Sequence, residues 1–157
     1  MLRWTLYDFK TAREPWFEEA ESLYLKKIKP YAGLEVQHLK TLKADRDEAV
    51  LKKNFESKVL LEKLTSDDYV ILLDEKGKKM DSLEFSKLIS SVTESGKKRG
   101  VFIIGGAFGV SDEIKQRSQK SICLSDMVMN HLVAEVVLLE QFYRALTIIN
   151  RIPYHNQ

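Results

Sequence analysis

Two uninterrupted apolar runs are the feature that most constrains the fold of this chain. They are Tyr69–Leu73 and Val101–Ile104, and each has the length of one β-strand. A strand that is apolar on both faces is typical of a parallel sheet covered by helices on either side. Segments with helical spacing separate these runs from each other and from weaker strand candidates. The pattern therefore predicts an α/β protein with a largely parallel sheet flanked by helices.

The other expected elements follow from capping residues and apolar spacing. Further strands are expected over 2–7, 34–39 and 121–124, and helices over 15–29, from Asp45 to Leu64, after Asp81, after Ser111 and over 130–149. Asp45 with Glu48, and Asp81 with Glu84, have the spacing of capping boxes. The first two helices are expected to bury Trp16, Ala20, Leu23, Tyr24 and Ile28, and Val50, Leu51, Phe55, Val59 and Leu60, respectively.

The helix expected over 130–149 is apolar on nearly all sides. Such a helix must be covered on more than one face. In a domain of this size the second cover is expected from another subunit, which predicts a homodimer. The alternative is that the helix lies at the centre of a monomer.

Composition narrows the class of protein further. A chain of 157 residues fits one domain over 1–157. Its net charge of +2 gives no general basic field of the kind that many nucleic-acid-binding domains carry. Cys123 is the single cysteine, which excludes a disulfide framework and a cysteine-based zinc site. We expect a cytoplasmic protein with no signal peptide, no membrane span and no metal.

Three loops should follow the carboxyl ends of the central strands, where ligands bind in parallel α/β sheets. They are 74–79, 105–110 and 125–130, and the middle one contains Gly105-Gly106-Ala107-Phe108-Gly109. Glycines allow a backbone to approach a ligand closely. The spacing matches neither a dinucleotide-binding fingerprint nor a P-loop. Taken alone, this loop is better explained as a tight strand-to-helix turn that binds nothing.

Charged and aromatic residues near the C-terminus form a second candidate site. Glu140 and Arg144 lie four residues apart on the apolar helix, where charges are costly unless they are paired or functional. His131 is read as a capping or core histidine. The segment 151–155, with Arg151, Tyr154 and His155, combines stacking groups with positive charge, which suits an RNA base. A frayed tail is the alternative.

A signalling receiver module is a weaker alternative for the whole chain. Asp8 and Asp74 would end two strands, as phosphoacceptor residues do in such modules. The paired acid beside the first aspartate and the lysine after the fifth strand are both missing.

Four motifs in order resemble the ribosomal RNA large subunit methyltransferase H family of SPOUT methyltransferases, and the likeness spans essentially the whole chain. The motifs are Val70-Ile71-Leu72-Leu73-Asp74 with Gly77-Lys78; Phe102-Ile103-Ile104-Gly105-Gly106 with Gly109; Leu124-Ser125-Asp126-Met127 with His131; and Glu140-Gln141-Phe142-Tyr143-Arg144-Ala145 with Pro153-Tyr154-His155. The chain has Asn130 and Glu135 where the family usually has proline and arginine. It ends in Asn156-Gln157 where the family has a basic residue.

The resemblance implies a homodimer with a C-terminal trefoil knot and S-adenosylmethionine as the cofactor. The matching cofactor-binding positions are Leu73, Gly105, Gly106, Leu124, Ser125, Asp126, Met127, Val128 and Met129. The implied reaction is methylation of N3 of a pseudouridine in 23S rRNA, with the assembled ribosome as the substrate. A non-catalytic ribosome-binding or RNA-binding relative with the same fold is the alternative.

The family's reaction suggests roles for the C-terminal residues. Tyr154 and His155 are expected to contact the target base, and His155 is a candidate proton acceptor. Arg144 would position rRNA or stabilise the developing anion, and Glu140 would orient Arg144.

Overall fold

Five parallel strands form one sheet in the order β2-β1-β4-β3-β5. The structure is a computed structural model that describes residues 2–9 and 14–156. Its strands are β1 (Arg3–Phe9), β2 (Gly33–Leu39), β3 (Asp68–Lys79), β4 (Arg99–Ile104) and β5 (Lys120–Cys123). A receiver module has the order 2-1-3-4-5. The exchange of the third and fourth strands therefore excludes the receiver interpretation.

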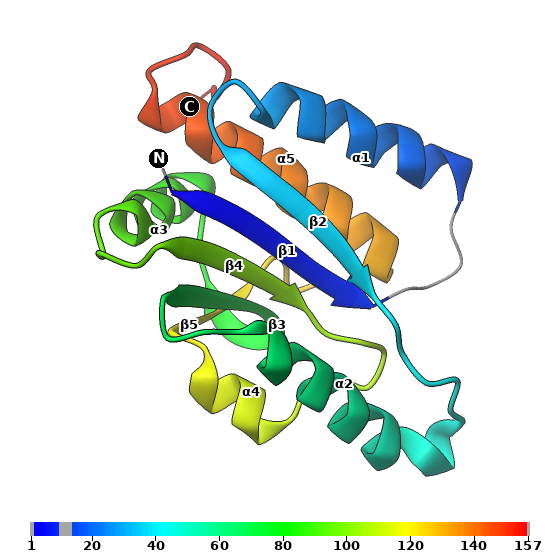
Figure 1. The fold of residues 1–157 in the computed structure, drawn as a ribbon. Coiled ribbons are helices and arrows are strands. Elements are labelled where there is room, and N and C mark those ends of the chain that lie inside the picture. The colour runs from blue at the N-terminus through cyan, green and yellow to red at the C-terminus, as the bar shows by residue number, and fades with distance from the viewer. Residues whose placement is uncertain (1, 10–13, 157) are drawn as a thin grey trace.

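Helices cover both faces of the sheet (Figure 1). They are α1 (Pro15–Ile28), the 3₁₀ turn η1 (Arg46–Glu48), α2 (Ala49–Lys63), α3 (Ser82–Thr93), α4 (Asp112–Arg117) and α5 (His131–Ile149). Helices α1, α3 and α5 pack on one face, and α2 and α4 pack on the other. The expected α/β architecture is confirmed.

Each face of the sheet has its own hydrophobic core, because successive strand side chains point in opposite directions. On the α5 face, Phe102 stacks on Trp4 with ring centroids 5.0 Å apart and meets Phe142 edge-on at 5.4 Å. On the α2 face, Val101 and Ile103 are fully buried. This double burial explains why the strand sequences are continuously apolar.

Helix α5 is covered largely within its own chain. It packs between α1 and α3, beside the sheet, so elements of the same chain cover most of its surface, and the homodimer stays a prediction. Val133 and Ile149 remain 40% and 39% exposed. Among the described residues, no helix is both long and apolar enough to cross a membrane.

Two helix starts agree with the sequence patterns and one does not. Asp81 and Glu84 form the predicted capping box, and Ser111 accepts a hydrogen bond from the Ile114 backbone N–H. The capping box predicted at Asp45 is wrong, because the side chain of Asp45 makes no cap hydrogen bond and η1 precedes α2. A 3₁₀ turn changes the spacing on which that motif depends.

The predicted buried faces of the first two helices are also partly wrong. Trp16 and Leu23 are exposed, and Phe17 is buried in their place. In α2 the expected Val50, Leu51 and Phe55 are exposed, Leu60 is buried as predicted, and the polar Glu56 and Ser57 are buried as well. Both polar side chains are paired with backbone groups: Glu56 accepts a hydrogen bond from the Gly106 N–H, and the Ser57 hydroxyl accepts one from the Ser111 N–H.

The loop expected over 74–79 is instead a continuation of β3. The strand runs to Lys79, with an irregular register between Leu73 and Lys78 where it pairs with β5. This extension forms one wall of the site at the carboxyl edge of the sheet.

Candidate functional site

A cavity of about 500 Å³ lies at the carboxyl ends of β3, β4 and β5. Segments 73–76, 104–110 and 123–129 line it, together with residues from the start of α5. All the cofactor-binding residues expected from the resemblance line this cavity except Asp126. The Asp126 carboxylate instead accepts from the Lys79 ammonium at 2.6 Å on the exposed surface. The three chain segments therefore converge as the sequence predicted.

The last of these segments presents apolar side chains to solvent. Met127 and Val128 are 79% and 86% exposed. The turn before them is fixed by the Met127 backbone N–H, which donates to the Ser125 hydroxyl at 3.0 Å. Exposed apolar residues beside a cavity are typical of surfaces that a ligand or a partner covers.

A buried carboxylate of α2 holds the glycine-rich loop 105–110 in place. Glu56 of α2 is 2% exposed and accepts hydrogen bonds from the Thr41 hydroxyl and the Gly106 backbone N–H. Burial raises its pKa, and its hydrogen bonds and the nearby Lys52 oppose that shift. Gly109, with φ of +79°, closes the loop in a conformation that favours glycine. Sequence reasoning missed Glu56, because an acid within a helix normally faces water.

His131 lies at the edge of the cavity, at the start of α5. Asn130 caps this helix by accepting from the Leu132 backbone N–H at 2.8 Å. Burial lowers the pKa of His131, which favours its neutral form. It therefore offers the cavity a neutral imidazole.

The four expected catalytic residues form one connected cluster at the other end of α5. Arg144 donates to Glu140 through Nε at 3.0 Å and Nη2 at 3.1 Å. Its guanidinium also lies over the Tyr154 ring, 4.6 Å from the centroid, and the Tyr154 hydroxyl donates to Glu140 at 3.3 Å. The hydrogen bonds with Glu140 raise the pKa of Arg144, and burial raises the pKa of Tyr154. The cluster thus holds a fixed cation beside a neutral phenol.

His155 completes the cluster in a defined orientation. Arg144 Nη1 lies 3.1 Å from His155 Nδ1, and because a guanidinium can only donate, Nδ1 accepts. In the neutral ring the proton is then on Nε2. That atom is buried without a hydrogen-bond partner among the described residues. The sequence does not indicate which ring nitrogen of His155 is left without a partner.

The C-terminal cluster and the cavity lie far apart in one chain. Arg144 follows His131 by thirteen residues on the same helix, which corresponds to about 20 Å. The C-terminus lies beside the starts of the strands, near the N-terminus, whereas the cavity is at the strand ends (Figure 1). The structure therefore forms both expected groups of residues but does not bring them together within one protomer.

The fold and the position of the cavity match a class of methyltransferases that act on nucleic acids. The chain belongs to the SPOUT methyltransferase family, whose sequence model, described as a predicted SPOUT methyltransferase, matches residues 2–155. The resemblance recognised from the motifs is thereby confirmed, and the family fold implies the expected C-terminal trefoil knot.

Three relatives show which proteins this chain is similar to. The chain is 49% identical to ribosomal RNA large subunit methyltransferase H of Bdellovibrio bacteriovorus, over 99% of each sequence. It is 37% identical to the protein of the same name from Trichlorobacter lovleyi, over 92% of this chain and 93% of that protein. A putative RNA methyltransferase of Arabidopsis thaliana is 35% identical over 85% of this chain and 69% of its own length.

Proposed function

We propose that this chain transfers a methyl group from S-adenosylmethionine to N3 of a pseudouridine in 23S rRNA, within the assembled ribosome. The observation that carries the proposal is the convergence of three strand-end segments on one cavity, in a chain of the SPOUT methyltransferase family. The names of the relatives support rRNA of the large subunit as the substrate.

The cavity fits the cofactor in size and chemistry. Its volume of about 500 Å³ lies within the range usual for small-molecule sites. Leu73, Ile104 and Leu124 supply apolar walls for an adenine ring, and the backbone of Gly105 and Gly106 supplies polar groups at close approach. When bound, the cofactor supplies an electrophilic methyl group on a sulfonium. The chain then has to align the base with that methyl and remove the N3 proton.

We assign the second half of the site to a partner protomer. The cluster of Glu140, Arg144, Tyr154 and His155 lies at the opposite end of α5 from the cavity, so a twofold homodimer is needed to place it over a cofactor. The exposed Met127, Val128 and Val133 give the cavity side of the chain an apolar surface for such an interface.

The hydrogen bonds define what each residue of the cluster does. Glu140 holds the guanidinium of Arg144 in one orientation by a two-bond contact, so Arg144 is a fixed positive charge for an anionic base or a phosphate. Tyr154 offers an aromatic ring for stacking. His155 would donate Nε2–H to a carbonyl oxygen of the base once that atom, which is buried in this protomer, is uncovered. The Nδ1 atom of His155 already accepts from Arg144, so proton removal by His155 would require that bond to break.

The small net charge is compatible with this substrate. Tight binding to bare RNA depends on neutralising many phosphates, whereas an assembled ribosome can be recognised by shape with a few local cations. The proposed place of action is the cytoplasm, where ribosomes are assembled.

The decisive experiment measures methyl transfer to ribosomes that contain pseudouridine but lack this methylation. Labelled S-adenosylmethionine is the donor, and the methylated nucleoside is identified by mass spectrometry. We expect transfer by the parent chain, and none by His155→Ala, which should still bind the cofactor in calorimetry. Cofactor binding without transfer by the parent chain would support the non-catalytic alternative.

A mixing experiment tests the shared site. A pocket variant, Gly106→Val, and a cluster variant, Arg144→Ala, are each expected to be inactive. After denaturation and joint refolding, random pairing should restore about a quarter of the parent activity, because half the dimers are mixed and each contains one intact site. No recovery, with mixed dimers shown by native mass spectrometry, would place both halves in one chain.

A further inference from the structure

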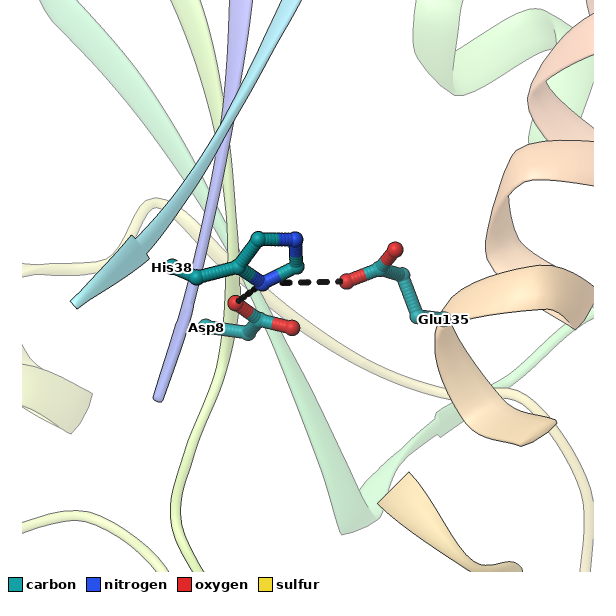
Figure 2. A group of neighbouring side chains, drawn as sticks. All are labelled: Asp8, His38 and Glu135. Atoms are coloured by element: carbon teal, nitrogen blue, oxygen red, sulfur yellow. Dashed lines mark hydrogen bonds and ion pairs between the residues drawn. The ribbon is translucent and has the colours of Figure 1, made fainter. Parts of the chain in front are cut away.

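Outside the cavity, four ionisable side chains meet beside the first turns of α5. Asp8 and His38 are paired residues of the neighbouring strands β1 and β2. Glu135 reaches them from α5, and its carboxylate points at the His38 ring (Figure 2). Glu21 of α1 contacts the other side of that ring. The methyl-transfer proposal uses none of these side chains.

Glu135 is the least satisfied polar group of this cluster. Its side chain is 0% exposed, and neither carboxylate oxygen accepts a hydrogen bond from a donor group among the described residues; only the carboxyls of Asp8 and Glu21 lie within hydrogen-bonding reach. The nearest cationic atom is His38 Nδ1, 4.0 Å from Oε1, which is too far for a hydrogen bond. Its other polar neighbours, Asp8 and Glu21, are acids as well. A buried carboxylate in such surroundings requires a proton or a cation.

The donor atoms are spaced as ligands of a small cation. Nδ1 of His38 and one carboxylate oxygen each from Asp8 and Glu135 all lie within 4.8 Å of one another. A tetrahedral ion with ligands at about 2.1 Å separates them by about 3.4 Å. Nδ1 is now 2.5 Å from Asp8 Oδ1 and 4.0 Å from Glu135 Oε1. These two distances must change by about 0.9 and 0.6 Å, and the distance between the two carboxylate oxygens by at most about 1.4 Å, to reach the required spacing.

Glu21 gives the imidazole the orientation that a metal ligand needs. The Nε2 atom of His38 lies 3.1 Å from Glu21 Oε2, so Nε2–H donates to that carboxylate. A metal-bound histidine almost always donates its second N–H in this way, which directs the other nitrogen to the ion.

We propose that Asp8, His38 and Glu135 bind one divalent transition-metal ion, of which Zn²⁺ is the representative, with Glu21 as the positioning residue. One imidazole with carboxylates favours such an ion over Mg²⁺, which prefers oxygen ligands only. The ion joins β1, β2 and the first turns of α5. Because His131 and Ala134 of those turns also line the cavity, the ion fixes one cavity wall without entering the methyl-transfer chemistry.

The charges around the imidazole also suit a cation. The carboxyl groups of Asp8, Glu21 and Glu135 lie 2.5, 3.1 and 4.0 Å from the ring nitrogens of His38, so three acidic groups surround one imidazole. The expectation of no metal considered cysteine ligands, whereas these ligands are separated by up to 127 positions.

The test is metal binding by the full chain after treatment with a chelator. Calorimetry with Zn²⁺ should show one site per chain, and Mg²⁺ at the same concentration should show none. X-ray absorption of the zinc-loaded protein should show nitrogen and oxygen neighbours at about 2.0–2.2 Å and no sulfur. A sulfur neighbour, equal binding of Mg²⁺, or no stoichiometric zinc would overturn the proposal.

Substitutions locate the site. Glu135→Gln and His38→Gln should each weaken zinc binding at least about 100-fold, and Glu21→Gln should weaken it about 10- to 100-fold. Glu113→Gln, on the exposed surface of α4, and His131→Gln, at the cavity, are the matched controls and should bind as the parent does. Circular dichroism verifies that each variant is folded, and Asp8→Asn replaces any variant that is not. Parent-like affinity in the folded cluster variants would refute the assignment.

Discussion

Replacing Gly106 by alanine should damage the proposed cofactor site through one identifiable contact. A Cβ at this position would overlap Oε1 of Glu56 most strongly, and it would lie 2.7 Å from Oε2 and 2.8 Å from Cδ. Normal contacts of this kind are about 3.5 Å, so the loop or the carboxylate must move by about 1 Å or more. Glu56 is buried and already bonded to Thr41, so the loop has to give way.

The size of the effect follows from the cost of overpacking. Inserting a methyl group into a packed site usually costs about 1–3 kcal/mol. If the displaced backbone of Gly106 contacts the cofactor, that energy corresponds to a roughly 5- to 150-fold loss of affinity for S-adenosylmethionine. If the same energy instead destabilises the protein without cofactor, the melting temperature should fall by roughly 2–12 °C.

A double-mutant cycle with Glu56→Ala identifies the cause. This second change removes the atoms that the new methyl group would meet, so the Gly106→Ala penalty should shrink by about 1 kcal/mol or more in that background. Calorimetry with the cofactor and thermal denaturation of the four proteins give the two energies. Equal penalties in both backgrounds would refute the steric argument, and Ala107→Gly serves as a control substitution within the same loop.

Three further predictions concern other parts of the fold. Burial alone would raise the pKa of Asp68, but hydrogen bonds from Arg99 and from a backbone N–H lower that pKa overall. The ionised carboxylate therefore stabilises the folded chain above the ordinary pKa of 3.8, and this stabilisation is lost as the pH falls through the lower pKa of the folded state. Asp68→Asn should therefore cost about 3 kcal/mol at pH 7, or roughly 6–12 °C, in thermal denaturation, and a penalty that did not narrow in acid would contradict this. Arg144→Lys loses the two-bond contact with Glu140 and should lower kcat about 10- to 100-fold in the ribosome assay, while the cofactor affinity measured by calorimetry stays unchanged. A parallel loss of cofactor affinity would argue against Arg144 as a fixed positive charge for the base or a phosphate. Ser111→Ala removes the cap of α4 and should cost about 1 kcal/mol in urea denaturation, with no change expected in cofactor binding.

The sequence predicted those features that depend on neighbouring residues. The apolar runs at Tyr69–Leu73 and Val101–Ile104 are strands buried on both faces, and the Asp81 cap and the Glu140–Arg144 ion pair form as their spacing indicates. Each of these depends on interactions within a few positions or on burial of a whole strand.

Features that depend on distant residues were not predictable in the same way. Glu56 is buried because Gly106, fifty positions later, presents a backbone N–H to it. The cluster of Asp8, His38 and Glu135 depends on strand register and on where α5 crosses the sheet. Neither arrangement leaves a local pattern. The sequence therefore suggested only a phosphoacceptor role for Asp8 and only a departure from the family pattern at Glu135, and it did not suggest that the two residues meet.

The separation of the cavity from the C-terminal cluster along α5 has a genetic consequence if partner protomers complete the site. A chain defective in only one of the two halves still forms one working site when it pairs with a normal chain. A chain defective in both halves spoils both sites of every mixed dimer, since it disables its own cavity and denies its partner the cluster. Single defects in this protein should therefore be recessive, whereas the combined defect should be dominant-negative when both chains are produced in one cell.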